Sequence, residues 1–223
     1  MQIDIAGEAM LLDHRRALLW PRRRTLVVAD VHLGKGSAFR RAGVPVPSGS
    51  TRDDLARLSA LIDEHRAERL LVLGDLFHAQ LQAHEPWFAD MERFTARHPA
   101  LEFRVVRGNH DRIAGVPAHW RIQWREAPLV DAPFVFMHDA APSPLGYALG
   151  GHLHPVTTLR DAHDKLRLPV FWLRAHYGVL PSFGAFTGGF EARASRDDRL
   201  AAVTPERVIA LPRTCNDAGA PQR

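Results

Sequence analysis

Five short polar blocks contain the residue types that bind hard or borderline divalent metal ions. Each block follows an apolar run that is typical of a buried β-strand. The blocks are Asp30-Val31-His32, Gly74-Asp75, Gly108-Asn109-His110-Asp111, His138-Asp139 and Gly151-His152-Leu153-His154. Together they supply carboxylates, imidazoles and one carboxamide, which is enough for two adjacent metal ions. Two metal ions a few ångströms apart are suited to the hydrolysis of phosphate esters.

The first three blocks are expected to meet at one edge of a sheet. Nearly continuous apolar runs at residues 25–29, 70–73 and 103–106 predict buried strands. Helices are expected between them, one capped by Ser50 or Thr51 and ending near Arg66, the other around residues 85–97. In such a βαβαβ unit, ligands bind beyond the carboxyl ends of the strands. Asp30, Asp75 and Asn109 should therefore converge.

The remaining strands predict the rest of the fold. Short runs at residues 3–5, 10–12 and 17–20 predict an antiparallel meander before the first buried strand. Later runs at residues 134–137, 147–149, 170–173, 183–186 and 208–211 have short connections and predict a second, mainly antiparallel sheet. The predicted fold is α/β, a two-sheet β-sandwich flanked by helices.

Composition limits the class of protein. The chain has 223 residues, of which 46% are apolar, and we expect one domain at residues 1–212 and a flexible tail at residues 213–223. No apolar stretch reaches about 18 residues, so no membrane-spanning helix is expected. The acidic residues 1–10 do not resemble a signal peptide. The single cysteine, Cys215, gives no disulfide framework and favours a cytoplasmic location.

The charge balance favours anionic partners only weakly. The net charge is +4, and only Lys35 and Lys165 among the 29 basic residues are lysines. The planar guanidinium of arginine suits phosphate oxygens. A GC-rich genome would also favour arginine codons, so this feature alone leaves phosphate binding open.

The order of the five blocks resembles that of the calcineurin-like metallophosphoesterase superfamily. The resemblance runs over residues 25–155, and the later strands fit the rest of that fold. Four stretches are similar to the bacterial ligase-associated DNA damage response phosphoesterases, namely residues 28–35, 41–47, 74–78 and 183–189. This resemblance implies a manganese-dependent endonuclease that acts on single-stranded DNA and is encoded with a DNA ligase and a helicase-like partner.

The resemblance also assigns roles to individual residues. It implies a first metal held by Asp30, His32 and His154, a second held by Asn109, His138 and His152, and Asp75 as the bridge between them. His110 would bind the scissile phosphate or give a proton to the leaving oxygen, and Asp111 would orient His110. Mixed oxygen and nitrogen ligands suit Mn²⁺, Fe²⁺ or Zn²⁺, and the residues do not rank these metals.

Three residues near the blocks each have two alternative roles. His78 lies three positions after Asp75, where many superfamily members have an acidic residue. It is a candidate catalytic contact to the phosphodiester, with a purely structural hydrogen bond as the alternative. Lys35 and Arg112 are candidate phosphate contacts, with solvent exposure as the alternative.

Three other functions compete with a nuclease. A UDP-2,3-diacylglucosamine pyrophosphatase of lipid A synthesis is similar in the first three blocks, but it needs an apolar insertion, and residues 111–138 are a short stretch with Trp120 and Trp124 among charged residues. A phosphomonoesterase is possible because two-metal sites cleave both kinds of ester. A non-catalytic binding module would be expected to have lost ligands, whereas all seven and His110 are present.

Overall fold

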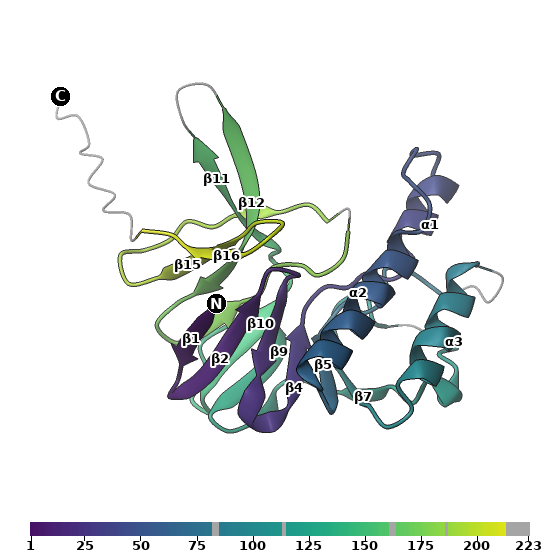
Figure 1. The fold of residues 1–223 in the computed structure, drawn as a ribbon, viewed down its shortest axis with the longest axis horizontal. Coiled ribbons are helices and arrows are strands. Elements are labelled where there is room, and N and C mark those ends of the chain that lie inside the picture. Colours follow the sequence, from purple (N-terminus) through teal and green to yellow (C-terminus); the bar gives the residue numbers. More distant parts are fainter. Residues whose placement is uncertain (82–84, 113–114, 161–163, 186, 213–223) are drawn as a thin grey trace.

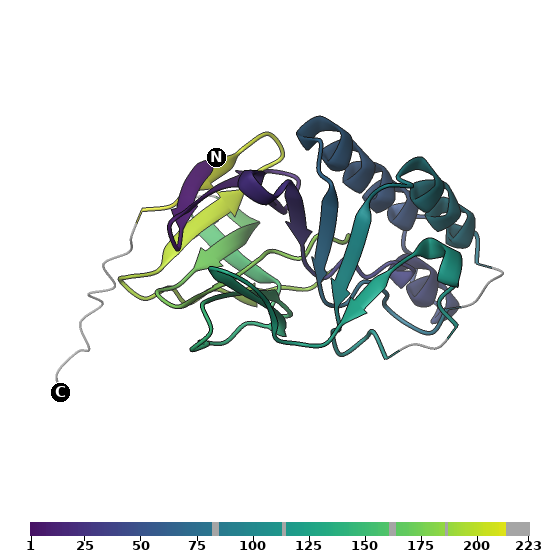
Figure 2. The ribbon, with the colours of Figure 1, turned by 90° about the horizontal axis from the view of Figure 1, so that it is seen from below.

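Two sheets packed face to face form the body of the computed structural model, which describes residues 1–81, 85–112, 115–160, 164–185 and 187–212. Three helices cover the outer face of the first sheet (Figure 1, Figure 2). The predicted two-sheet sandwich flanked by helices is therefore confirmed. The predicted tail at residues 213–223 and Cys215 lie outside the described residues. A single domain over residues 1–212 stays a prediction.

The first sheet has seven strands in sequence order. They are β1 (Gln2–Ile5), β2 (Glu8–Asp13), β3 (Ala17–Trp20), β4 (Thr25–Val28), β5 (Arg69–Leu73), β6 (Glu102–Val106) and β7 (Gln123–Arg125). Strands β1 to β4 pair antiparallel, as the predicted meander requires. Strands β4 to β7 pair parallel, so the carboxyl ends of β4, β5 and β6 share one edge.

The helices follow the predicted pattern with one addition. They are α1 (Lys35–Arg41), α2 (Ser50–His65) and α3 (Trp87–Arg97), with 3-10 turns η1 (Pro21–Arg23) and η2 (Ala118–Trp120). Leu55, Leu58 and Leu61 recur at helical spacing in α2 and are buried against the sheet. The sequence did not indicate α1, a short helix that presents only Gly36 as a fully buried residue.

The second sheet is mixed rather than purely antiparallel. Its strands are β8 (Leu129–Asp131), β9 (Phe134–Asp139), β10 (Tyr147–Gly151), β11 (Pro155–Arg160), β12 (Lys165–Leu173), β13 (Tyr177–Val179), β14 (Phe190–Glu191), β15 (Arg199–Val203) and β16 (Val208–Ala210). The central pairs β9–β10 and β10–β13 are parallel, whereas β12 pairs antiparallel with β11, β13 and β15. Because β9, β10 and β13 are parallel, their carboxyl ends share one edge of the second sheet.

Side-chain alternation along the buried strands builds two cores. In β4, Leu26 and Val28 pack beneath the helices, whereas Val27 packs between the two sheets. In β5, Leu70 and Leu71 divide in the same way. Because neighbouring side chains point to opposite faces, each strand of this region must be apolar on both sides. This requirement explains the continuous apolar runs that precede the polar blocks.

Two further expectations have different outcomes. The strand predicted at residues 183–186 is wrong for residues 183–185, which form a bend after a single bridge between Ala29 and Ser182; Phe186 lies outside the described residues. In this segment Gly184 approaches the backbone of Val31 so closely that a Cβ there would collide with the carbonyl oxygen of Val31. Among the described residues, no helix combines the length and apolar character needed to cross a membrane.

Candidate metal centre

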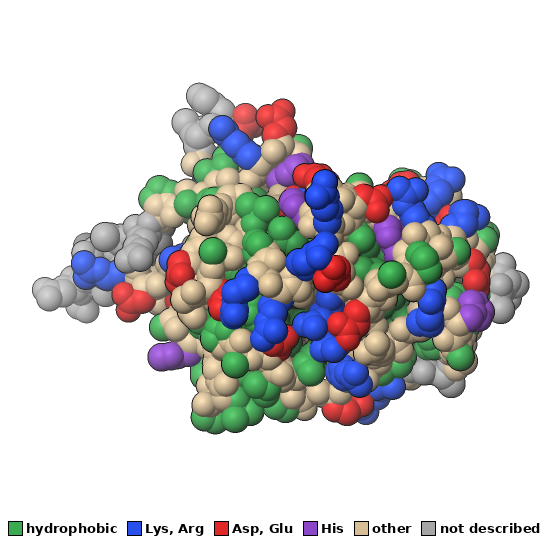
Figure 3. Space-filling view, turned by 60° about the horizontal axis from the view of Figure 1, so that its bottom comes forward, with side chains coloured by type: hydrophobic (Ala, Val, Ile, Leu, Met, Phe, Trp, Pro, Cys, Tyr) green, Lys and Arg blue, Asp and Glu red, His purple; other side chains and the backbone are tan. Residues whose placement is uncertain are grey.

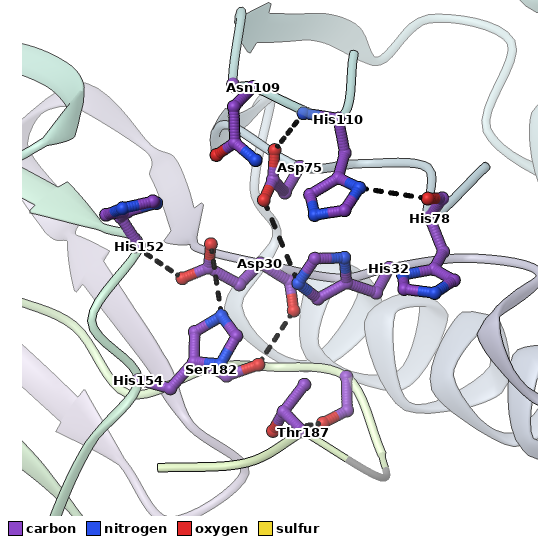
Figure 4. Close-up of polar contacts among 12 residues, drawn as sticks. Asp30, His32, Asp75, His78, Asn109, His110, His152, His154, Ser182 and Thr187 are labelled. Atoms are coloured by element: carbon purple, nitrogen blue, oxygen red, sulfur yellow. Dashed lines mark hydrogen bonds and ion pairs between the residues drawn. The ribbon is translucent and has the colours of Figure 1, made fainter. Parts of the chain in front are cut away.

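The structure brings all seven predicted ligands together at the carboxyl ends of five strands. The side chains of Asp30, His32, Asp75, Asn109, His152 and His154 surround one space (Figure 4). Asp30 and His32 follow β4, Asp75 follows β5, and Asn109 follows β6. His138 lies in β9, and His152 and His154 follow β10. Both sheets therefore contribute, although the assignment of these residues as ligands stays a prediction.

Asp75 occupies the position that a bridging ligand requires. Its Oδ1 accepts a hydrogen bond of 2.9 Å from the backbone N–H of His110. Its Oδ2 lies 3.5 Å from Nε2 of His138 and 3.9 Å from Nε2 of His32. The carboxylate is 2% exposed. Oδ1 is thus fixed by the backbone, and Oδ2 faces both the residues predicted to hold the first metal and those predicted to hold the second.

The first half of the cluster, Asp30, His32 and His154, contains buried polar atoms without hydrogen-bond partners. Oδ2 of Asp30 accepts a hydrogen bond of 2.9 Å from the backbone N–H of His152, but Oδ1 has none and lies 3.5 Å from Nε2 of His154. Both ring nitrogens of His32 also lack a hydrogen bond. Such unpaired buried groups are costly unless a cation satisfies them. Burial holds the pKa of His32 well below its usual value, which keeps the imidazole neutral as a metal ligand requires.

In the second half of the cluster, Asn109, His138 and His152, lone pairs of the candidate ligand atoms point toward one another. Nδ1 of His138 lies 3.0 Å from the carbonyl oxygen of Leu73, which only accepts, so Nδ1 carries the proton of the neutral ring. Nε2 of His138 then presents a lone pair to Oδ1 of Asn109 at 2.9 Å, and Nδ1 of His152 lies 3.1 Å away. Ligand atoms ~2.1 Å from one ion lie about 3 Å apart. The donor set therefore fits a divalent cation in each half.

Backbone strain is concentrated at the same residues. Asp30, His32, Asp75, His152 and His154 all have left-handed backbone conformations, with φ between 49° and 68°. This region of φ is unfavourable for residues with a side chain and persists where the surrounding structure enforces it. Five of the seven candidate ligands are thus held in conformations that the chain would not adopt by local preference.

Two motif glycines permit the close packing of the carboxylates. A Cβ atom on Gly108 would lie 2.5 Å from the backbone nitrogen of Asp75 and would also collide with its carboxylate. A Cβ on Gly151 would lie 2.6 Å from Cβ of Ala29 and would collide with Oδ2 of Asp30. These glycines are required because Asp75 and Asp30 lie directly against the neighbouring block's backbone.

The predicted partnership of His110 and Asp111 is wrong in its geometry. The carboxylate of Asp111 is fully buried and accepts hydrogen bonds from the backbone N–H groups of Gly108 at 2.9 Å and Phe77 at 3.3 Å. Nδ1 of His110 instead lies 3.0 Å from the carbonyl oxygen of His78. The tight turn at residues 108–111 directs Asp111 back into its own loop. Asp111 therefore holds the loop, and His78 orients His110 through its main chain.

The side chain of His78 lies beside the cluster. Its ring is stacked on that of His110 with a centroid distance of 5.3 Å and meets that of His32 edge-on at 5.4 Å. Its Nδ1 is buried without a hydrogen bond. Burial, together with the positive charges of Lys35 and His110, lowers the pKa of His78 to about 4. His78 is thus a neutral imidazole at the rim of the cluster.

The two candidate phosphate contacts differ in position. Lys35 begins α1, is half-buried, and lies over the ring of Phe39 at 5.8 Å. Burial lowers its pKa, although the charges of Asp30 and Asp75 act in the opposite direction. Arg112 is exposed after the turn at residues 108–111.

Sequence reasoning missed the segment that encloses Asp30 from the second sheet. The hydroxyl of Ser182 donates to the carbonyl oxygen of Asp30 at 2.9 Å, and the N–H of Gly184 donates to the same oxygen at 3.1 Å (Figure 4). Arg57 of α2 donates to the carbonyl oxygen of Phe183 and lies over its ring. The only signal in the sequence was the stretch at residues 183–189, which indicated a family but no role.

The comparisons with known proteins identify the class. The family model for calcineurin-like phosphoesterases matches residues 23–147, and the chain belongs to this family. The predicted superfamily is therefore confirmed.

Solved structures narrow the relationship further. The chain is similar to the Pseudomonas putida nuclease MPE, with 39% sequence identity, coverage of 95% of this chain and 99% of that chain, and a TM-score of 0.80. A second match is Yfce, a phosphoesterase from E. coli, with 15% identity, coverage of 81% and 88%, and a TM-score of 0.38. No curated protein sequence matches the chain significantly. The nuclease neighbour agrees with the resemblance to the ligase-associated DNA damage response phosphoesterases.

Proposed function

We propose that this phosphoesterase is an endonuclease that cleaves single-stranded DNA with two divalent metal ions. The observation that carries the proposal is the position of Asp75, whose free oxygen faces lone pairs from both halves of the cluster. The similarity to a nuclease over nearly the whole chain supports nucleic acid as the substrate class. Manganese as the metal, a role in DNA repair beside a DNA ligase and a helicase, and a cytoplasmic location belong to the proposal through the sequence resemblance.

Each half of the cluster would hold one ion. Asp30, His32 and His154 are the proposed ligands of the first ion and Asn109, His138 and His152 those of the second, with Asp75 shared. When bound, the two ions lower the pKa of a water nucleophile and neutralise charge on the phosphate oxygens. The chain supplies no serine, cysteine or aspartate nucleophile in this scheme, so no covalent intermediate with the protein is expected.

His110 is proposed to act on the phosphate directly. Since the carbonyl oxygen of His78 fixes the proton on Nδ1, Nε2 is the ring atom left for the substrate. When protonated, Nε2 would bind a phosphate oxygen or give its proton to the leaving oxygen. The side chain of His78 would contact the next part of the diester, and Lys35 would add positive charge at the same rim.

The lipid pyrophosphatase alternative lacks its apolar cap. Within the described residues 115–137, Trp120 is buried, donates a hydrogen bond of 2.8 Å to Glu92, and packs on Phe88. Trp124 packs against the helix-side core rather than projecting outward. Val130 is the one large apolar side chain of that stretch with substantial exposure. A surface for acyl chains is therefore not supported.

Circular single-stranded DNA tests the proposal. Incubation of the purified protein with Mn²⁺ and a labelled circle should give linear products, since a circle offers no ends to an exonuclease. The variant Asp75→Ala should leave the circle intact. Hydrolysis of bis-p-nitrophenyl phosphate without any cutting of the circle would overturn the proposal and favour a small-molecule substrate.

A further inference from the structure

A projecting β-hairpin begins directly beside the candidate metal centre. Strand β11 starts at Pro155, one residue after His154, and returns as β12. The hairpin stands clear of the sandwich (Figure 1). Its base therefore shares a backbone segment with a proposed metal ligand, while its outer part reaches into solvent.

The strand register sorts the hairpin side chains into two faces. The cross-strand pairs Val156–Pro169, Thr158–Arg167 and Arg160–Lys165 lie on one face. The intervening pairs Thr157–Leu168 and Leu159–Leu166 lie on the other. The first face thus carries three basic side chains, all exposed, and the second is mostly apolar. We call the first the basic hairpin face.

A cavity of about 360 Å³ connects the basic hairpin face to the metal centre. Its lining includes His154, Val156, Arg167, Arg16 and Thr187. Arg167 also donates a hydrogen bond of 2.5 Å to the carbonyl oxygen of Gly189, another lining residue. The cavity therefore leads from a candidate ligand to the start of the basic residues.

The charges on this path favour a polyanion. Arg16 is half-buried beside the cavity and lies 3.4 Å from the carbonyl oxygens of Ser182 and Gly184. The acidic neighbour Glu191 accepts hydrogen bonds from the backbone N–H and hydroxyl of Thr158 and keeps its negative charge, but the basic side chains Arg16, Arg160, Lys165 and Arg167 outnumber it. Asp164 adjoins Lys165 at the hairpin's outer end. Figure 3 shows basic and acidic side chains side by side on the projecting hairpin, with histidines at its base.

We propose that the basic hairpin face binds the sugar-phosphate backbone of single-stranded DNA on the His154 side of the scissile phosphate. The inference rests on the proposed function and deepens it by assigning a surface to the substrate beyond the metal centre. Arg160 lies four residue steps along the strand from Val156, which is about 13 Å at ~3.3 Å per residue. A small diester seated at the metals does not reach Arg160, whereas a continuous strand does. Electrostatic contacts of this kind bind without base preference.

Binding of a fluorescein-labelled oligo(dT) of thirty nucleotides, followed by anisotropy in EDTA, tests the inference without cleavage. The variant Arg160→Ala/Lys165→Ala should raise Kd about tenfold, and the slope of log K against log salt should fall by ~1.4, since each lost contact contributes about 0.7 on a single strand. The matched control is Arg93→Ala/Arg97→Ala on α3, whose ion pairs with Asp90 and Asp63 are exposed and lie on the helix layer. The control should bind like the wild type.

The same variants separate this inference from the proposed function. If the hairpin variant binds within twofold of the wild type with an unchanged salt slope, the inference is overturned even though the protein still cuts DNA. If the hairpin variant binds more weakly but neither the wild type nor any variant cuts circular DNA, the proposed endonuclease activity fails and the binding surface stands. In the cleavage assay, the ratio of DNA cutting to bis-p-nitrophenyl phosphate hydrolysis should fall about tenfold for the hairpin variant only.

Discussion

Two clusters of acidic and histidine side chains in this molecule differ in what satisfies their carboxylates. Asp13 lies with Glu64 and His65, and its oxygens accept hydrogen bonds from Arg15, through the backbone N–H at 2.8 Å and through the guanidinium at 2.9 and 2.7 Å. Asp30 lies with His32 and His154, and its Oδ1 has no hydrogen-bond partner. Both carboxylates are buried.

The difference shows what distinguishes a structural ion pair from a metal centre of similar composition. A buried carboxylate requires a counter-charge. Near Asp13 the chain provides that charge itself. Burial alone would raise the pKa of Asp13, but the hydrogen bonds from Arg15 outweigh it and hold the pKa well below its usual value. Near Asp30 and Asp75 no arginine enters the cluster among the contacts of the described residues, and the space is left to a cation.

Removal of the shared carboxylate should have the largest effect. In Asp75→Ala both halves of the cluster lose a ligand, so kcat/KM for bis-p-nitrophenyl phosphate in Mn²⁺ should fall by about 10³-fold or more. The matched change in the other cluster, His65→Ala, should leave the rate within about twofold. Near-normal turnover by Asp75→Ala would mean that the cluster is not the catalytic centre.

Removal of His110, the proposed proton donor, should have a smaller effect on the rate of hydrolysis. The ring of His110 hydrogen-bonds to the carbonyl oxygen of His78 and packs edge-on against His32 with a centroid distance of 5.3 Å. In His110→Ala, hydrolysis should slow by about 10²-fold while metal content is retained. Metal content can be measured by atomic absorption after gel filtration. If the variant loses metal instead, His110 supports the cluster rather than the substrate.

A glycine variant tests the packing behind Asp30. In Gly151→Ala the new Cβ collides with Oδ2 of Asp30, so the affinity for Mn²⁺ should fall by about tenfold. Isothermal titration with Mn²⁺ measures this change. The control is Gly188→Ala, where a Cβ would have no atom within 4 Å. Equal affinities in the two variants would show that Asp30 tolerates displacement.

Substitutions in the Asp13 cluster should change the stability of the fold and leave metal binding unchanged. Arg15→Ala removes the guanidinium that balances the charge of Asp13 and leaves the backbone N–H of residue 15 and His65 as its partners. It should lower the free energy of unfolding of the metal-free protein by about 2 kcal/mol. Arg97→Ala breaks only an exposed ion pair and should change it by about 0.5 kcal/mol or less. Urea unfolding measures both. A change in Mn²⁺ affinity in Arg15→Ala would contradict the distinction between the clusters.

The pH dependence of that stability has a definite sign. Because the folded-state pKa of Asp13 is depressed, its stabilisation is fully present above the unfolded-state pKa of about 3.9 and is lost as the pH falls further. The difference in unfolding free energy between the wild type and Arg15→Ala should therefore be constant from pH 7 to 5 and shrink below pH 4. A difference that grows on acidification would contradict this assignment.

The positions of the candidate ligands were predictable because they depend on the local sequence pattern. Each apolar run ends where its strand leaves the core, so Asp30, Asp75 and Asn109 had to meet at the carboxyl edge of a parallel sheet. The partners of single atoms were not predictable, because they depend on turns between distant segments. Asp111 faces its own loop, and Ser182 reaches Asp30 across the sandwich. The parallel pairing at the centre of the second sheet was also not predictable, because an apolar run indicates a strand but not the direction in which it pairs.

The number of ions that the chain binds tests the central claim most directly. Equilibrium dialysis against Mn²⁺ should give two ions per chain for the wild type and for His65→Ala, since the Asp13 cluster already has its counter-charge. Asp75→Ala should retain fewer than one ion, because its carboxylate is shared by both halves of the centre. Two ions in Asp75→Ala, or the loss of one in His65→Ala, would contradict the account.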